Sequence, residues 1–432
     1  MGWNGIAYVR NVTWRDLERL APRTKAVWEQ VARSRPRPVL EKVPPYLRIP
    51  SVLPTDPKWG EILNAKNAIS STNREVLLRY LISRAVVDQG ADVAGVEMWH
   101  DLVCQRSYAH GITFLHDPSI FVTRYPEILA IAHEAREEVT KARSAIWASG
   151  GTNRHEASYS PFMINGQRGS GRTNGFVAAR LFPTILLSKI RTGGLTDLLF
   201  GKMASESAAE MSRRLRDDPL EGLDWVMGDK SCDLFTKWAV GSYRLTAGLL
   251  DGWTAEDCPI PMDQRIGRTL MRCGFMDEFY SVSRVASSAS WGLTPLGSQI
   301  RPVRASTGVP SGRWHLTVMN FRRNAKVERN DLKKWIEEER RSLGLRTGAS
   351  DTGPQSLVSL LCRSMNASLG TSVTPVELDD FLMWLAADTV ATLDPGMGTC
   401  HDESPECSRC ALRDVCQANN DPGASALTGY IT

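Results

Sequence analysis

The sequence of 432 residues lacks any apolar run near the roughly 20 residues that a helix needs to cross a bilayer, so we expect no membrane span. It also lacks a basic head followed by an apolar segment at its start, so we expect no secretory signal. Neither sign of charge predominates, because the chain has 52 Lys and Arg residues and 48 Asp and Glu residues. The resulting net charge of +4 indicates no class of partner. With 42% hydrophobic and 23% charged residues, the composition excludes disordered and collagen-like chains.

Cysteines are few and unevenly placed. Five of the nine are scattered along the chain, and we expect them to be small buried side chains: Cys104, Cys232, Cys258, Cys273 and Cys362. The other four lie close together near the end of the chain: Cys400, Cys407, Cys410 and Cys416. An odd total without a secretory signal indicates a reducing compartment, where clustered cysteines bind metal more often than they form disulfides.

The spacing of the last four cysteines, C-x6-C-x2-C-x5-C, can wrap one soft metal centre. Zinc and an iron–sulfur cluster are the two candidates. Tetrahedral zinc sites usually pair two short cysteine knuckles, and this motif has one. The 6-2-5 spacing resembles the [4Fe-4S] loop of the endonuclease III branch of helix-hairpin-helix DNA glycosylases. The resemblance implies a [4Fe-4S] cluster held by these four cysteines, with structural zinc as the less favoured alternative.

Two further marks of that family lie upstream. Residues 235–250 predict the end of one helix, a turn at Gly241 and a second helix, and Asp263 then precedes an amphipathic segment. This order resembles the family's DNA-binding hairpin followed by its aspartate. The resemblance assigns DNA contact to six hairpin residues: Val240, Gly241, Ser242, Tyr243, Arg244 and Thr246. Tyr243 departs from the family pattern, which has a second glycine there.

The remaining mark is a helix whose C-terminal end carries a glutamine. Residues 72–75 form a capping box that predicts a helix start, and an apolar helical pattern follows. The segment resembles the family's second helix, which implies that Gln89 fills the gap left by an extruded base. The adenine-mismatch branch has a glutamate one turn earlier, where this chain has Ala85 or, one residue away, Arg84. We therefore assign no adenine specificity.

Asp263 is the candidate catalytic residue. Breaking an N-glycosidic bond develops positive charge on the sugar, and a carboxylate can stabilise that charge and orient a water. The alternative role for Asp263 is a helix N-cap, and both roles can coexist. Bifunctional family members carry a lysine nucleophile in the second hairpin helix, and this chain has Leu245 there. The resemblance therefore implies a monofunctional enzyme that uses water.

We expect an all-α fold with two helical lobes and an iron–sulfur loop. Residues 1–70 would form an extension that packs on the cluster lobe. Residues 71–262 would form a helical barrel with an insertion at about 150–175 and the hairpin at about 229–250. Residues 263–432 would form the second lobe, with an insertion at about 290–350 and the cysteine loop at 400–416. Residues 319–353 are highly charged and predict an exposed helix and linker.

The resemblance implies a base-excising enzyme for a damaged or bulky modified base, in DNA repair or in defence against modified phage DNA. Its partner would be DNA, and we expect a cytoplasmic, nucleoid-associated monomer. Two alternatives stay open. One is a base-modifying transferase of the α-glutamyl/putrescinyl thymine pyrophosphorylase type, in which Asp263 would act as a base. The other is an iron–sulfur DNA-binding protein without catalysis.

Overall fold

A computed structural model describes the chain in a series of segments. These are residues 17, 19–34, 71–87, 93–149, 194–202, 207–224, 226–250, 253–262, 264–276, 278–279, 303–304, 310–311, 327, 329–342, 354–386, 399–400 and 406–420. The described residues are mostly helical, as the predicted all-α class requires. Their strands are one antiparallel pair of two residues each, β1 (Val303–Arg304) and β2 (Pro310–Ser311). No helix in these segments is long and apolar enough to cross a membrane.

The chain divides into two compact units. Unit 1 comprises Met1–Pro38 and Pro259–Thr432, and unit 2 comprises Val39–Cys258. Unit 1 is therefore built from both ends of the chain. The division at 258–259 lies close to the expected one at 262–263, whereas the N-terminal contribution to unit 1 ends at Pro38 rather than at residue 70. The predicted insertion at 150–175 lies outside the described residues.

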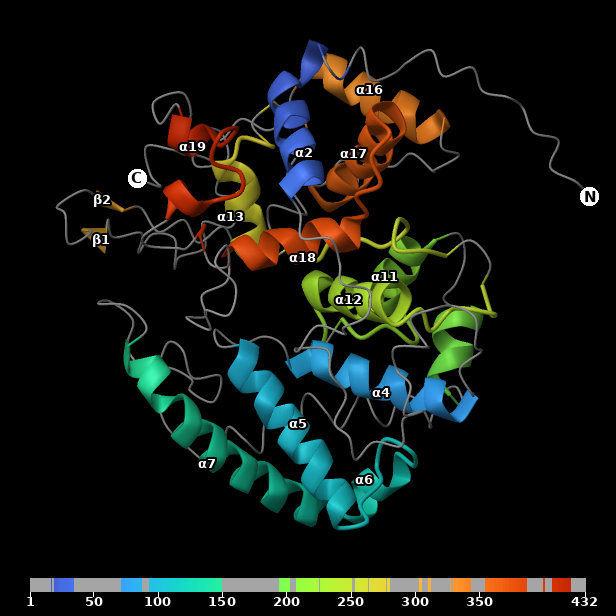
Figure 1. The fold of residues 1–432 in the computed structure, drawn as a ribbon. Coiled ribbons are helices and arrows are strands. Elements are labelled where there is room, and N and C mark those ends of the chain that lie inside the picture. The colour runs from blue at the N-terminus through green and yellow to red at the C-terminus, as the bar shows by residue number, and fades with distance from the viewer. Residues whose placement is uncertain are drawn as a thin grey trace, which may run out of the picture. The chain divides into compact units, whose positions relative to one another are not determined.

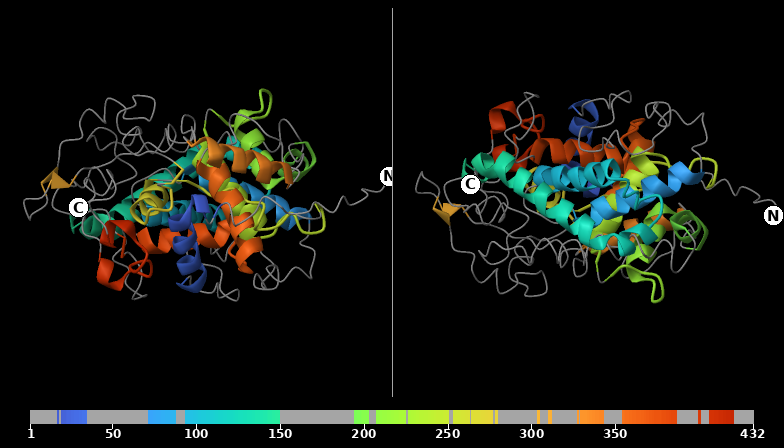
Figure 2. Two further views of the ribbon diagram at one scale, coloured as in Figure 1. Left: turned by 90° about the horizontal axis from the view of Figure 1, so that it is seen from above. Right: turned by 90° about the horizontal axis from the view of Figure 1, so that it is seen from below.

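Unit 2 contains eight described helical elements (Figure 1). They are α4 (Ser71–Val87), α5 (Val93–Ala109), α6 (Ser119–Thr123), α7 (Tyr125–Ser149), η3 (Asp197–Lys202), α11 (Ala208–Asp217), α12 (Asp229–Thr236) and η4 (Lys237–Ser242). The η3 and η4 segments are π-helices. Helices α5 and α7 lie side by side in Figure 2 and contact each other. Helix α4 contacts α5, α12 and η4. Every side chain of α4 from Val76 to Val86 is buried, so α4 is the central helix of this unit.

The predicted capping box at the start of α4 is wrong. The helix already includes Ser71 and Thr72, so Thr72 is not its N-cap. The Glu75 carboxylate instead accepts hydrogen bonds from the backbone N–H groups of Leu195 and Thr196, at 2.9 and 2.7 Å. The capping-box pattern assigned the Glu75 carboxylate to the start of α4. In the structure this carboxylate instead binds backbone N–H groups of a segment that is distant in the sequence.

Unit 1 contains seven described helical elements. They are α2 (Pro22–Ser34), α13 (Gln264–Arg272), α16 (Asn330–Ser342), α17 (Pro354–Leu369), α18 (Pro375–Ala386), η8 (Cys407–Arg409) and α19 (Gln417–Asn420). The α2 helix begins with proline, and the Glu278 carboxylate accepts from the free backbone N–H groups of Arg23 and Thr24, at 3.2 and 3.0 Å. One apolar core joins α2, α13, α16, α17 and α18.

The charged segment expected to form an exposed helix contains α16, and this helix is not simply exposed. Its Leu332, Trp335 and Ile336 side chains are buried in the core of unit 1, and α16 contacts α17. Apolar side chains three and four residues apart face one side of a helix, so the charged residues of α16 cover only its outer side. The segment thus belongs to the folded body of unit 1.

Candidate functional site

The four clustered cysteines lie between α18 and α19 in the chain, and we call residues 400–416 the cysteine loop. The backbone N–H of Cys400 donates to the carbonyl of Leu385 in α18, at 2.7 Å. Within the loop, the N–H of Cys410 donates to the carbonyl of Cys407 across η8, at 3.1 Å. Cys400 is buried, whereas Cys407, Cys410 and Cys416 are partly buried. The loop is thus fixed to the helical body beside its first cysteine.

The four thiols are close enough to affect one another electrostatically. Burial raises the pKa of the Cys416 thiol to about 11, and the three other thiols of the loop contribute to this rise. Burial also raises the pKa of the Cys407 thiol, and the positive charge of Arg272 opposes this rise. Thiols with raised pKa hold their protons at neutral pH, so a metal must displace those protons when it binds.

Arg272, the last residue of α13, joins that helix to the cysteine loop. Its Nη1 donates to the carbonyl oxygen of Cys400 at 3.3 Å and lies 3.6 Å from the Cys400 sulfur. Its own carbonyl oxygen accepts from the Cys416 thiol at 3.5 Å. The Arg272 residue is only 4% exposed. The first and last cysteines of the loop therefore both contact the C-terminal end of α13.

Gly274 lies two residues after the end of α13 and lets three elements meet. It has a φ of 82°, and a Cβ atom there would lie 2.5 Å from Arg23 Cδ in α2 and 2.7 Å from Gln417 Oε1 in α19. The backbone N–H of Phe275 then donates to the carbonyl of Leu270, at 2.9 Å. Only glycine combines this left-handed conformation with such close neighbours. Helices α2, α13 and α19 are consequently packed together around one position.

The donor set of the loop fits a metal centre in its chemistry. All nine cysteines are free, and the five scattered ones are buried as predicted. Within the described segments, no three His, Cys, Asp or Glu side chains converge on one metal-ion position. A single zinc ion needs sulfurs about 2.3 Å from one point. In a [4Fe-4S] cube each iron takes one cysteine, so the four sulfurs need not meet at a point.

Asp263 and Gln89 both lie outside the described residues, and the structure gives no distance between them. Their chain neighbours are described. Helix α13 begins at Gln264, so Asp263 directly precedes it, as the sequence predicts. Helix α4 ends at Val87, two positions before Gln89. Ile266 and Leu270 of α13 are buried, and α13 packs on α18, so the helix that follows Asp263 is firmly held.

The predicted helix-hairpin-helix is wrong in its second half. Helix α12 continues into η4, which ends at Ser242, and residues 243–250 then form turns and bends rather than a helix. Arg244 has a φ of 49° and Gly248 a φ of 75°, and left-handed residues cannot continue a right-handed helix. The carbonyl of Ala247 accepts from Arg74 of α4, at 3.2 Å. A tertiary contact thus holds the non-helical conformation.

The six predicted hairpin residues differ in their exposure. Val240, Tyr243 and Thr246 are buried, Gly241 and Ser242 are partly buried, and Arg244 is exposed. The N–H of Tyr243 donates to the carbonyl of Trp238, at 2.8 Å. Tyr243 therefore packs inward where the family pattern has glycine. Leu245, in the place of the family's lysine, is fully buried. Arg244 is the member of this set best placed for a ligand.

A buried polar network between α4, α5 and η4 was not found from the sequence. The Tyr80 hydroxyl donates to Asp101 Oδ1 at 2.6 Å, and Arg84 Nη1 donates to Tyr80 Oη at 2.7 Å. The Arg84 guanidinium lies 5.8 Å from the centre of the Tyr80 ring and 6.0 Å from that of Trp238. Burial raises the pKa of Tyr80 well above its usual value, so this hydroxyl stays a donor. Arg84 thereby connects the C-terminal part of α4 with the hairpin segment.

The same network contains a serine, a histidine and an aspartate in the order of a nucleophilic triad. His100 Nε2 lies 2.9 Å from Ser83 Oγ, and His100 Nδ1 lies 3.8 Å from Asp101 Oδ1. Ser83 and His100 are each 1% exposed, and the Ser83 hydroxyl donates to the Tyr80 carbonyl at 2.9 Å. The one Ser83 hydroxyl proton is shared between this carbonyl and His100, and the burial of both side chains leaves no room for a substrate beside the hydroxyl. The network is structural.

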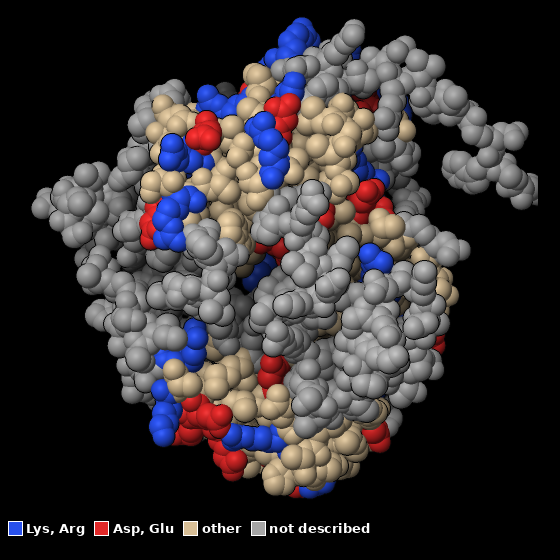
Figure 3. Space-filling model, in the orientation of Figure 1, with Lys and Arg blue, Asp and Glu red and all other residues tan. Residues whose placement is uncertain are grey.

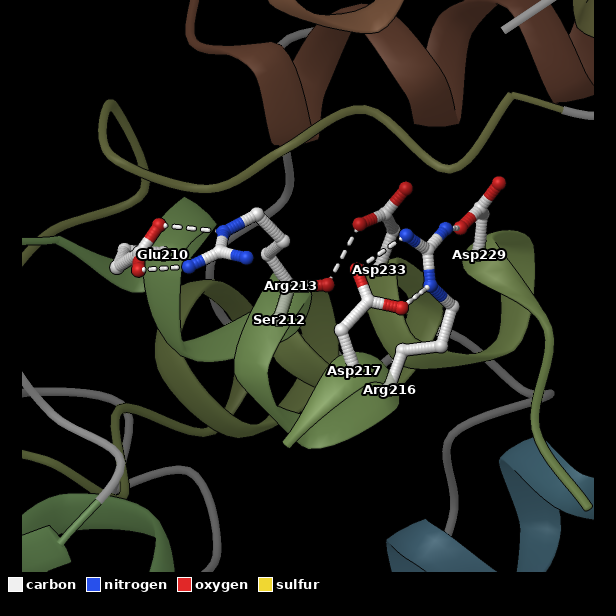
Figure 4. A network of polar contacts seen from close by, with 7 residues as sticks. All are labelled: Glu210, Ser212, Arg213, Arg216, Asp217, Asp229 and Asp233. Carbon is white, nitrogen blue, oxygen red and sulfur yellow. Dashed lines mark hydrogen bonds and ion pairs between the residues drawn. The ribbon is translucent and has the colours of Figure 1, made fainter. Parts of the chain in front are cut away.

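A second polar network joins α11 to α12 (Figure 4). Arg216 of α11 pairs with Asp217 and with Asp229 of α12, and the Ser212 hydroxyl donates to Asp233 Oδ1 at 2.6 Å. Asp229 and Asp233 are buried. Buried carboxylates need such partners, so these contacts account for the aspartates as helix-packing residues.

Acidic and basic side chains of the described residues lie together on the face drawn in Figure 3. In Figure 3 the exposed lysines and arginines of the described residues are interspersed with aspartates and glutamates. In the cysteine loop, Arg409 pairs with Glu406 and Arg413 with Asp414. These two arginines of the loop are thus offset by acidic neighbours.

No protein-family model, curated protein or solved structure matches the chain. The resemblance to helix-hairpin-helix DNA glycosylases consequently depends on the residues of the motifs, their order and their surroundings in the fold.

Proposed function

We propose that the protein is a monofunctional DNA glycosylase that removes a base through Asp263. The observation that carries this proposal is the contact between Arg272 and the cysteine loop. It joins the loop that resembles the family's cluster to the one helix that begins directly after the family's aspartate. These two marks lie 137 residues apart in the sequence, and the sequence alone gives no reason for them to share a helix.

In this reaction the C1′–N bond of the target nucleotide breaks, and a water oxygen forms the new bond to C1′. The Asp263 carboxylate stabilises the positive charge that develops on the sugar and accepts the proton of the attacking water. The departing base takes up a proton, and an abasic sugar remains. Asp263 precedes a helix whose far end is fixed by Arg272, and this support would hold the carboxylate in place.

The hairpin segment would bind the phosphate backbone. Arg244 is exposed in the non-helical part of this segment, and its left-handed backbone is the kind of strained conformation that is found at functional sites. Leu245 has no amine, so a lysine-type covalent intermediate is not available at that position. This supports hydrolysis by water. The enzyme must also take the base out of the stack, which is the role we propose for Gln89.

Cys400, Cys407, Cys410 and Cys416 would hold a [4Fe-4S] cluster. When bound, such a cluster ties its loop to the rest of the fold and can exchange single electrons. The 6-2-5 spacing of these four free thiols is what supports a cube over zinc. The chain's own contribution is to anchor the loop, through Cys400 on α18 and through Arg272 on α13.

A substrate panel tests the proposal. The purified protein is incubated with duplexes that carry different damaged or bulky modified bases, and the products are identified by mass and by alkali-labile breaks. We expect a free base and an abasic site from at least one duplex. A base that becomes heavier while still attached to DNA would instead show a transferase, and DNA binding without any product would show a non-catalytic protein.

A further inference from the structure

Arg74, in the first turn of α4, is a buried cation in a position that is costly for stability. The residue is only 6% exposed. Its Nη2 donates to the carbonyl oxygen of Ala247 at 3.2 Å, and its Nε makes no hydrogen bond to any part of the chain that the structure describes. Buried charges are stable when charged partners surround them, and a cation at the start of a helix also opposes the helix dipole. This guanidinium instead binds an uncharged carbonyl, so its burial is poorly compensated.

The neighbouring carboxylate of Glu75 compensates Arg74 only in part. Burial lowers the pKa of Arg74, and the charge of Glu75 raises it to a smaller extent. Glu75 also accepts from the backbone N–H groups of Leu195 and Thr196, and it pairs with Arg79 at 3.3 Å. Several donors therefore share one negative charge. An apolar side chain of similar length would fill the space of Arg74 at a lower cost in free energy.

Arg74 holds the segment that carries Arg244. Ala247, whose carbonyl it binds, donates its own backbone N–H to the carbonyl of Arg244 at 3.0 Å. In a helix the Ala247 carbonyl would instead accept from the backbone four residues further along the chain. The bond from Arg74 thus favours the turn over the helix. In this turn Arg244 is exposed, while Leu245 and Thr246 beside it are buried.

We propose that Arg74 is a positioning residue for the contact between Arg244 and a DNA phosphate. It fixes the turn through Ala247, so that the guanidinium of Arg244 is presented to the DNA at a defined place. The protein tolerates the cost of the buried charge because a turn that is already fixed loses less conformational entropy when it binds the phosphate. This inference rests on the proposed function, because DNA is its ligand.

The test compares Arg74→Met, Arg74→Lys, Arg244→Gln and the double variant of Arg74→Met with Arg244→Gln. The Met variant removes the charge and the hydrogen bond but keeps a long side chain, and the Lys variant keeps a charged donor. Arg106→Met is the matched control, because this arginine of the same unit pairs with Glu134 and Glu138. Urea unfolding measures stability. Titration of a labelled, unmodified duplex at several salt concentrations measures DNA binding.

We expect Arg74→Met to be as stable in urea as the wild type or more stable, because it removes a poorly compensated buried charge. Its DNA binding should nevertheless weaken, and the slope of log binding constant against log salt concentration should fall by about 0.9, as in Arg244→Gln. The double variant should show no further fall, because both changes remove the same contact. Arg74→Lys should retain most of the slope, and Arg106→Met should match the wild type in slope.

A loss of stability in Arg74→Met with an unchanged salt slope would overturn the proposal, because Arg74 would then act in folding alone. A fall of about 1.8 in the double variant would overturn it as well, since Arg74 would then bind a phosphate of its own. A wild type that binds DNA but releases no base would overturn the glycosylase proposal, while the role of Arg74 in DNA binding stands. Base release by the wild type, with the slope of Arg74→Met unchanged, would leave the glycosylase proposal alone standing.

Discussion

The guanidinium of Arg272 lies 3.6 Å from the sulfur of Cys400, across 128 residues of sequence. The contact fixes the C-terminal end of α13 to the first cysteine of the loop. Asp263 lies at the other end of the same helix. Under the proposed function, this contact gives a physical reason for a metal-binding loop in an enzyme whose chemistry needs no metal, because the loop would support the helix that follows the carboxylate.

Gly274→Ala should destabilise unit 1. A left-handed conformation costs a non-glycine residue about 1–2 kcal/mol, and the side chains of Arg23 and Gln417 must also move to admit the methyl group. Gly370→Ala is the control, because Gly370 has a φ of 66° but a methyl group there would have nothing within 4 Å. Denaturant unfolding measures both. Equal losses of stability would show that the close packing around Gly274 is unimportant.

Acidification should destabilise the protein through His100. Burial lowers the pKa of His100 below its ordinary value of 6.5, so the unfolded chain binds the proton first as pH falls. The stabilising contribution is complete above about pH 6.5 and declines below it, towards the lowered pKa of the folded state. Melting temperatures at neutral and acidic pH should differ less in His100→Gln than in the wild type. His110→Gln, at an exposed position, should change nothing.

Arg244→Gln should weaken DNA binding to a similar extent for all sequences. The side chain is exposed in a segment held by buried neighbours. A contact to one phosphate contributes about 0.9 to the slope of log binding constant against log salt concentration. Titrations at several salt concentrations should show the slope reduced by that amount. The control is Arg124→Gln, an exposed arginine of the same unit that pairs with Glu127. An unchanged slope in Arg244→Gln would remove the hairpin from the DNA interface.

The sequence predicted those features that depend on local spacing. The start of α13 directly after Asp263 is of this kind, because helical periodicity is a property of short segments. The second hairpin helix was predicted from residues that are individually compatible with a helix. Its failure comes from Gly248 and from the bond between Arg74 and Ala247, a partner far away in the sequence.

The other features that were missed are also tertiary. Ser83 and His100 are single polar residues in apolar helices, and only the packing of α4 against α5 brings them together. Gly274 is one glycine among 34, and its neighbours Arg23 and Gln417 come from opposite ends of the chain. Arg272 resembles the other charged residues of an amphipathic helix until the cysteine loop packs on it. Short-range patterns do not carry this information.

Base release by Asp263→Asn under single-turnover conditions tests the central claim most directly. The control is Asp257→Asn, which changes an aspartate six positions earlier whose carboxylate accepts from the backbone of Thr254. We expect the wild type and the control to release a base from a modified duplex, and Asp263→Asn to do so roughly 100-fold more slowly or worse while still binding the DNA. Release at the wild-type rate by Asp263→Asn, or no release by the wild type from any duplex, would contradict the account.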